Sequence, residues 1–151
     1  MPDPATAPRV KVCGLTRLRD ARAAAAAGAE YLGAVLVPSS PRAVDAASAA
    51  RIGEARPGSL VVVSADAEPA VLASRARRAE AAVLQLHGDE SPADVRRLGE
   101  EGSWRVWKAV RVRGAEDVED ALERYGPVAD ALLLDGWHRD RLGGTGASFP
   151  W

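Results

Sequence analysis

Short apolar runs rich in β-branched residues recur along the chain and predict six strands. The runs are RVKVC (9–13), YLGAVLV (31–37), LVVVSA (60–65), AVLQLH (82–87), WRVWKAVRV (104–112) and DALLLD (130–135). Polar or glycine positions bound each run, as is usual where a strand meets a turn.

The segments between these runs have helical spacing and are rich in Ala, Arg, Glu and Leu. Examples are 17–29, 68–81, 91–102 and 114–126, several of which open on Ser, Pro, Asp or Glu and close on Gly. Each repeat takes roughly 22 to 27 residues, the length of one strand plus one crossover helix. This alternation predicts an α/β fold with a parallel sheet, either an open doubly wound sheet or consecutive units of a closed eight-stranded barrel.

Composition narrows the partners that we expect. The chain has 151 residues, 47% hydrophobic and 27% charged, with a formal net charge of −1. This predicts a single globular domain over 9–151 behind a disordered tail over 1–8, in a cytoplasmic protein. We expect neither a nucleic acid nor a membrane partner, because there is no basic excess, no signal-peptide pattern and no apolar run of membrane-spanning length.

Reactive side chains stand where the predicted strands end. In a parallel α/β sheet the carboxyl ends of the strands carry the chemistry. Cys13 is the single cysteine, which rules out a disulfide within the chain and a four-cysteine metal site. It is either a packed, inert thiol or a base that the ammonium of Lys11, on the same strand face, helps to ionise. Asp135 is either a turn cap or a general acid or base.

Other polar positions also allow two interpretations each. His87 is a hydrogen-bonded core residue or a catalyst, and Arg42 caps local backbone or clamps a carboxylate in bidentate fashion. Lys108 lies within a strand, so we expect it to meet polar partners in the interior or to stand on an edge strand. The GGTG segment containing Gly143 and Gly144 is a turn or a loop that closes over a substrate, and it fits neither a Rossmann fingerprint nor a Walker loop.

Five motifs, taken together, resemble the phosphoribosylanthranilate isomerase family. They are VKVCGLT (10–16), SPR (40–42), LQLHGDE (84–90), WKAVRV (107–112) and LLLDGWHRDRLGGTGASFPW (132–151). Their order and spacing match the family over nearly the whole chain. The resemblance therefore favours the (β/α)8 barrel over the open sheet.

The resemblance also implies an activity. It is the Amadori rearrangement of N-(5-phosphoribosyl)anthranilate, a small phosphosugar, in tryptophan biosynthesis, with no cofactor and no metal. By motif position, Cys13 is the expected general base and Asp135 the expected general acid. The residues expected to bind substrate are Arg42, at the anthranilate carboxylate, His87, Lys11, Lys108, Gly143 and Gly144.

The chain departs from the family in two respects. Six units are visible where a complete barrel has eight, and Pro150 replaces the aspartate of the usual FDW. We therefore expect a barrel without its last two units. Alone it would be inactive or nearly so, and it would pair edge to edge as a homodimer or with a complementing C-terminal fragment. The alternatives are a partial record of an ordinary isomerase, a binding or assembly module that has lost catalysis, and an open flavodoxin-like domain that binds a flavin or nucleotide.

Overall fold

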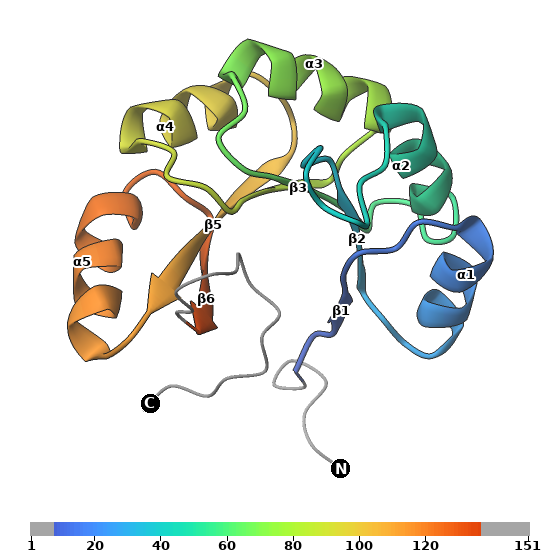
Figure 1. Ribbon diagram of the computed structural model, residues 1–151, viewed down its shortest axis with the longest axis horizontal. Coiled ribbons are helices and arrows are strands. Elements are labelled where there is room, and N and C mark those ends of the chain that lie inside the picture. Colours follow the sequence, from blue (N-terminus) through green and yellow to red (C-terminus); the bar gives the residue numbers. More distant parts are fainter. Residues whose placement is uncertain (1–7, 137–151) are drawn as a thin grey trace.

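The computed structural model describes residues 8–136 of the chain (Figure 1). Its strands are β1 (Lys11–Val12), β2 (Tyr31–Val35), β3 (Leu60–Ser64), β4 (Val83–Leu86), β5 (Arg105–Val112) and β6 (Ala131–Gly136). Its helices are α1 (Leu18–Ala26), α2 (Ala46–Gly53), α3 (Pro69–Ala79), α4 (Pro92–Glu100) and α5 (Ala115–Tyr125). All six predicted strands are confirmed, and so are the four helical segments named above; α2 is an additional helix.

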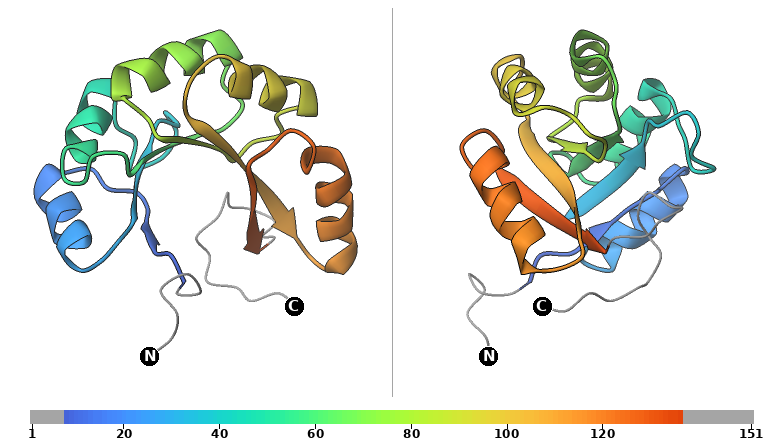
Figure 2. Two further views of the ribbon diagram at one scale, coloured as in Figure 1. Left: turned by 180° about the vertical axis from the view of Figure 1, so that it is seen from behind. Right: turned by 60° about the vertical axis from the view of Figure 1, so that its left-hand side comes forward.

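The six strands form one sheet in the order β1-β2-β3-β4-β5-β6, and every neighbouring pair is parallel. A doubly wound sheet reverses its strand order at a switch point and carries helices on both faces. Here the order never reverses, and the five helices line the convex side of a curved sheet (Figures 1 and 2). The described residues therefore form a half-barrel. The doubly wound alternative, including the flavodoxin-like domain, is wrong.

Two apolar layers cover the two faces of the sheet. Between sheet and helices lies the larger core, which includes Leu32, Leu84 and Val106, each fully buried. On the concave face, Tyr31 packs edge to face against Trp107 with ring centroids 4.9 Å apart, beside a cluster of buried valines. Strands buried on both faces show continuous rather than alternating apolar runs, which explains the sequences of β2 and β3.

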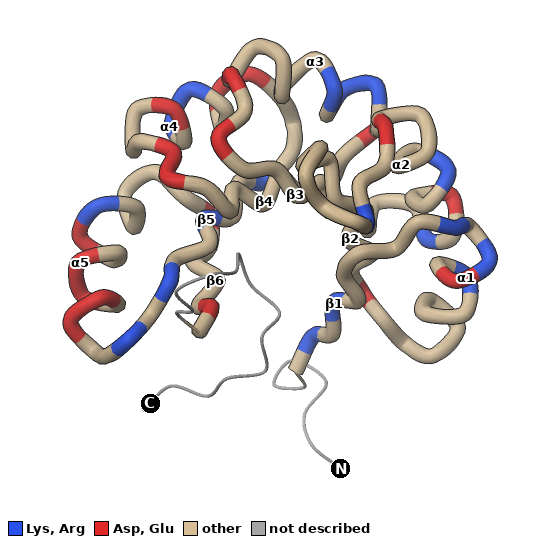
Figure 3. The backbone as a smooth tube through the Cα atoms, in the orientation of Figure 1, with Lys and Arg blue, Asp and Glu red and all other residues tan. Residues whose placement is uncertain are grey.

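Within the described residues, no helix has the length and apolar character that crossing a membrane requires. Most charged positions are on the helices and loops, and β2, β3 and β4 contain none (Figure 3). Charge on the strands is confined to those nearer the edges of the sheet, β1, β5 and β6.

Carboxylates cap the N-termini of two helices and make stability depend on pH. Asp45 accepts a hydrogen bond from the backbone N–H of Ser48, and Glu68 accepts bonds from Ala70 and Val71. These backbone bonds hold both pKa values below their ordinary 3.8 and 4.5. A group whose pKa is lower in the folded state stabilises the fold above its unfolded pKa, and that contribution is lost as the pH falls through the folded pKa.

We therefore expect the free energy of unfolding to fall as the pH is lowered below about 4.5. Urea unfolding at a series of pH values measures this dependence. The matched variant carries Asp45→Asn and Glu68→Gln, which keep an accepting oxygen but do not titrate, so its curve should be flatter between neutral and acid pH. Equal slopes for the two proteins would contradict the assignment.

Candidate active site

Lys11 and Cys13 lie together over a glycine of the neighbouring strand. A Cβ built on Gly33 would be 3.1 Å from the Cys13 sulfur and 3.3 Å from Cε of Lys11. Both side chains therefore point to the concave face of the sheet, as the alternation of strand residues predicts. Gly33 leaves the space that they occupy, and Cys13 is exposed there.

Arg42 comes to the same end of the sheet through the loop after β2. A Cβ on Gly14 would be 2.6 Å from Nη1 of Arg42, so the guanidinium lies directly against the backbone that follows Cys13. Gly14 also has φ +79°, a conformation that L residues with a side chain rarely adopt. The turn after β1 thus favours glycine for its backbone conformation, and a side chain there would displace the Arg42 guanidinium.

His87 and Asp135 are hydrogen-bonded across the sheet. Nε2 of His87 lies 3.1 Å from Oδ2 of Asp135, and the side chains are only 17% and 19% exposed. The two residues come from the ends of β4 and β6, with β5 between them. The expectation that strand ends bring reactive groups together is met for this pair.

Gln85 is a member of this group to which the sequence analysis assigned no role. Its side-chain amide nitrogen lies 3.2 Å from Nδ1 of His87, and the residue is only 3% exposed. The spacing in the sequence could have indicated this contact, because Gln85 and His87 are two residues apart and such residues on a strand share a face. An apolar run is usually interpreted as core, which is why the glutamine was overlooked.

Arg111 was also overlooked as a neighbour of the acid. It is the register partner of Asp135 on β5, and its guanidinium pairs with Asp89 in the loop after β4. Alternation separates Arg111 from Lys108 along β5, but only the register of β5 with β6 places it on the face of Asp135. It adds a positive charge to the rim of the half-barrel.

Lys108 does not point to the concave face of the sheet, where Cys13 and Asp135 lie. In register Lys108 is opposite Leu86, so it points to the helix side of the sheet and is 2% exposed. Its ammonium donates to the carbonyls of Leu86, Gly88 and Ala109 and lies 3.1 Å from a carboxylate oxygen of Glu90. Because carbonyls accept from all three N–H groups of the ammonium, the contact between the ammonium and the Glu90 carboxylate is electrostatic and not a hydrogen bond. The expectation of polar partners in the interior is confirmed, and the edge-strand alternative is wrong.

Gly143 and Gly144 lie outside the described residues, so their predicted loop stays a prediction. Within residues 8–136, no group of three or more His, Cys, Asp and Glu residues could hold a metal ion.

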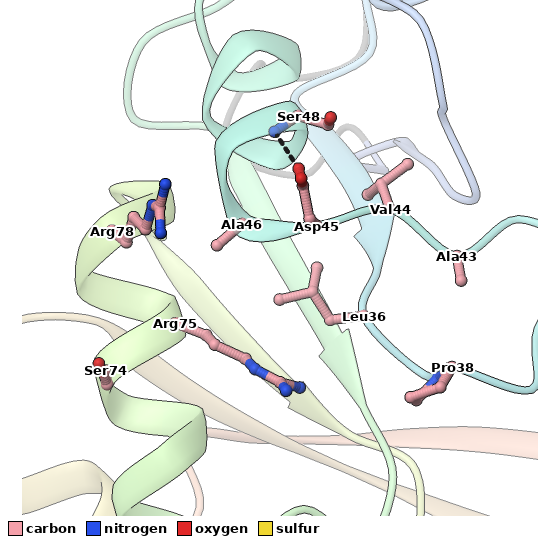
Figure 4. A pocket seen from close by; sticks show the side chains of 10 residues that line it. All are labelled: Leu36, Pro38, Ala43, Val44, Asp45, Ala46, Ser48, Ser74, Arg75 and Arg78. Carbon is pink, nitrogen blue, oxygen red and sulfur yellow. Dashed lines mark hydrogen bonds between the residues drawn. The ribbon is translucent and has the colours of Figure 1, made fainter.

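A cleft of about 660 Å³ lies away from the concave face, between the loop after β2, the N-terminus of α2 and the side of α3 (Figure 4). Asp45 lines it with its carboxylate turned to the Ser48 N–H, and Arg75 and Arg78 extend from α3 toward it. Cys13, His87 and Asp135 are not among its lining residues. The cleft is therefore separate from the candidate site.

Comparisons with known proteins agree on one family. Residues 10–151 match the family model described as N-(5'phosphoribosyl)anthranilate (PRA) isomerase. The N-(5'-phosphoribosyl)anthranilate isomerase of Rubrobacter xylanophilus is 43% identical over 145 residues, which are 95% of this chain and 69% of that protein. The chain thus spans about two thirds of the length of this relative.

Solved structures give the same result. The phosphoribosyl anthranilate isomerase of Thermotoga maritima is 34% identical with a TM-score of 0.84, over 96% of this chain and 69% of that one. A phosphoribosyl anthranilate isomerase in complex with reduced 1-(o-carboxyphenylamino)-1-deoxyribulose 5-phosphate is 34% identical with a TM-score of 0.78, over 87% of this chain and 66% of that one.

Proposed function

The chain belongs to the phosphoribosylanthranilate isomerase family, and from that premise we propose that Cys13 and Asp135 are the base and the acid of this isomerisation in tryptophan biosynthesis. The observation that supports this most is placement. Cys13 follows β1 and Asp135 lies near the end of β6, both on the concave face, at the two edges of the half-barrel.

The proposed chemistry needs one proton donor and one proton acceptor. Asp135 gives a proton to the ring oxygen of the phosphoribosyl group while the bond from that oxygen to the anomeric carbon breaks, which leaves an iminium at the amine. Cys13, as thiolate, removes the proton from the adjacent carbon, and the electron pair of that C–H bond forms the enolamine. The enolamine then takes up a proton at the former anomeric carbon and loses the proton of its enol hydroxyl, which gives the aminoketose. General acid and base groups with such roles typically contribute about 10²–10⁴-fold each.

Arg42 is proposed to bind the anthranilate carboxylate. Its guanidinium lies against Gly14, one residue beyond Cys13, and its planar shape suits bidentate pairing with a carboxylate. Lys11, beside the thiol over Gly33, is proposed to favour the thiolate form of Cys13.

Further residues complete the proposed site. His87 is proposed to form the wall beside Asp135, and Gly143 and Gly144, which lie outside the described residues, stay predicted substrate-binding residues. Lys108 is proposed to act structurally, through its buried pair with Glu90. We place the reaction in the cytoplasm, as the single cysteine and the composition indicate.

Gly14→Ala should weaken substrate binding, because a methyl group there displaces the Arg42 guanidinium. The matched control is Gly58→Ala, since Gly58 has φ +78° but no atom within 4 Å of an added Cβ. Both variants should lose about 1–2 kcal/mol of stability from left-handed backbone strain. Only Gly14→Ala should raise KM for the anthranilate substrate. Equal KM values in the two variants would argue against Arg42 as the carboxylate contact.

The function is tested by rescue of an isomerase-deficient tryptophan auxotroph. Within the described residues, β1 and β6 are the edge strands of an open sheet. We propose that the 151-residue chain needs these edges covered, by a second copy or by a supplied C-terminal quarter-barrel. Growth should be absent or weak with the chain alone and restored with the quarter-barrel. Failure of both arms, with both polypeptides folded, would favour a non-catalytic binding or assembly module.

A further inference from the structure

A buried glutamine, an imidazole and a carboxylate form a linear chain on the concave face. Gln85 contacts Nδ1 of His87 at 3.2 Å, and Nε2 of the same ring contacts Asp135 at 3.1 Å. Each ring nitrogen thus has one partner. Since a neutral imidazole carries its proton on only one nitrogen, the partner of Nδ1 decides what Nε2 offers to the aspartate.

The glutamine amide supports two self-consistent arrangements. In the observed one, the amide N–H donates to Nδ1, so the ring proton is on Nε2 and is donated to an ionised Asp135. If the amide turns by half a rotation, its oxygen accepts from a protonated Nδ1. Nε2 then has a lone pair that can accept from a protonated Asp135. The second arrangement holds one more proton than the first.

The surroundings of Gln85 keep both orientations accessible. Its amide oxygen is buried and has no hydrogen-bond partner in the structure. Among the described residues, no acceptor or donor other than the ring therefore holds the amide in one orientation, and either orientation makes one bond to the ring. Buried polar atoms usually have partners, so an unpaired one is a reason to look for a role.

We propose that Gln85 is a positioning residue for the isomerisation: the orientation of its amide decides whether Nε2 of His87 donates to Asp135 or accepts from it. The proposal rests on the role of Asp135 proposed above. With the amide oxygen on Nδ1–H, Nε2 accepts from the carboxyl group of Asp135, the form that gives its proton to the ring oxygen of the substrate. That delivery leaves the ring proton on Nδ1, so the return to the observed arrangement also exchanges the ring proton with water. Gln85 itself does not touch the substrate.

Charged groups that the structure describes near this chain are engaged in ion pairs. Arg111, the neighbour of Asp135 on β5, pairs with Asp89. Lys108 and Glu90 pair with each other on the opposite side of the sheet.

The experiment is ¹⁵N NMR of the histidine rings in the 151-residue protein. The chain has two histidines, and the spectrum of a His138→Gln variant assigns the signals. At about pH 8, well above the usual histidine range, His87 should have its proton on Nε2 alone. In Gln85→Glu, whose carboxylate can only accept, Nδ1 should become protonated at the same pH. An unmodified His87 with its proton on Nδ1 at that pH would overturn the proposal.

Gln85→Met is the control for packing, because it fills similar space without bonding to the ring. It should not protonate Nδ1, and its circular dichroism should match that of the unmodified protein. If Gln85→Glu does not fold, the tautomer of the unmodified protein still decides the matter. Unchanged ring signals in a folded Gln85→Glu would also overturn the proposal. If Asp135 is not the acid, the outcome is different. The Asp135→Asn variant then keeps full activity, while the ring signals of the unmodified protein and of Gln85→Glu are still as expected.

Discussion

Asp135→Asn is expected to lower kcat/KM by about 10²–10⁴-fold, because the amide cannot supply the proton that opens the sugar ring. Cys13→Ser should cause a loss of the same order, since a serine hydroxyl is far less readily ionised than a thiol. Both rates are measured in the form of the protein that rescues the auxotroph, with the phosphoribosylated substrate at concentrations well below KM.

The matched control is Asp120→Asn, the same chemical change at an exposed position on α5. It should leave kcat/KM unchanged. Asp135→Asn should keep the folded spectrum of the protein, because asparagine retains the shape of aspartate beside His87. A decrease of less than threefold in Asp135→Asn would remove this residue from the role of acid.

Lys108→Met is expected to cost about 3–5 kcal/mol of unfolding free energy, the largest stability effect that we foresee. The substitution leaves the carboxylate of Glu90 charged in the interior, where its side chain is only 5% exposed. Among the described residues, Glu90 then keeps only the backbone N–H groups of Asp66 and Gly88 as hydrogen-bond partners. Chemical denaturation with a two-state fit measures the loss.

Two further variants distinguish a buried pair from general damage to packing. The double variant Lys108→Met with Glu90→Gln should lose less than the two single variants added together, because the stranded charge is gone. Arg111→Met breaks an ion pair in which Asp89 is 82% exposed, and it should cost less than about 1 kcal/mol. Strict additivity in the double variant would contradict the account.

Local pattern was sufficient for the elements and for the positions of the main reactive groups. The β-branched runs located all six strands, and the ends of the first and last runs pointed to Cys13 and Asp135. The eight-residue helix α2 was not among the named segments, although Ala46, Ala49 and Ile52 are buried at helical spacing. Its clearest local signal is Asp45, three residues before Ser48, as an N-terminal cap.

Local sequence pattern does not predict which side chains of different strands contact one another. Alternation places Gln85 and His87 on one face, but the contact with Asp135 joins residues 48 positions apart. Nor does alternation say which face the helices cover. That assignment separates Lys108, with its carbonyls and Glu90, from the group around Asp135.

The sequence by itself determined the α/β alternation, the family and the residue types at the strand ends, because these depend on short-range periodicity and on motifs. Periodicity left the strand order open and the family resemblance favoured the barrel; the tertiary structure shows that the sheet runs from β1 to β6 without reversal and curves into a half-barrel. The tertiary structure also shows that Gln85 contacts His87, which in turn contacts Asp135, whereas the buried Lys108 donates to backbone carbonyls. The physical reason is that strand order and the side of the sheet that helices cover follow from packing between segments far apart in the chain, which local pattern does not record.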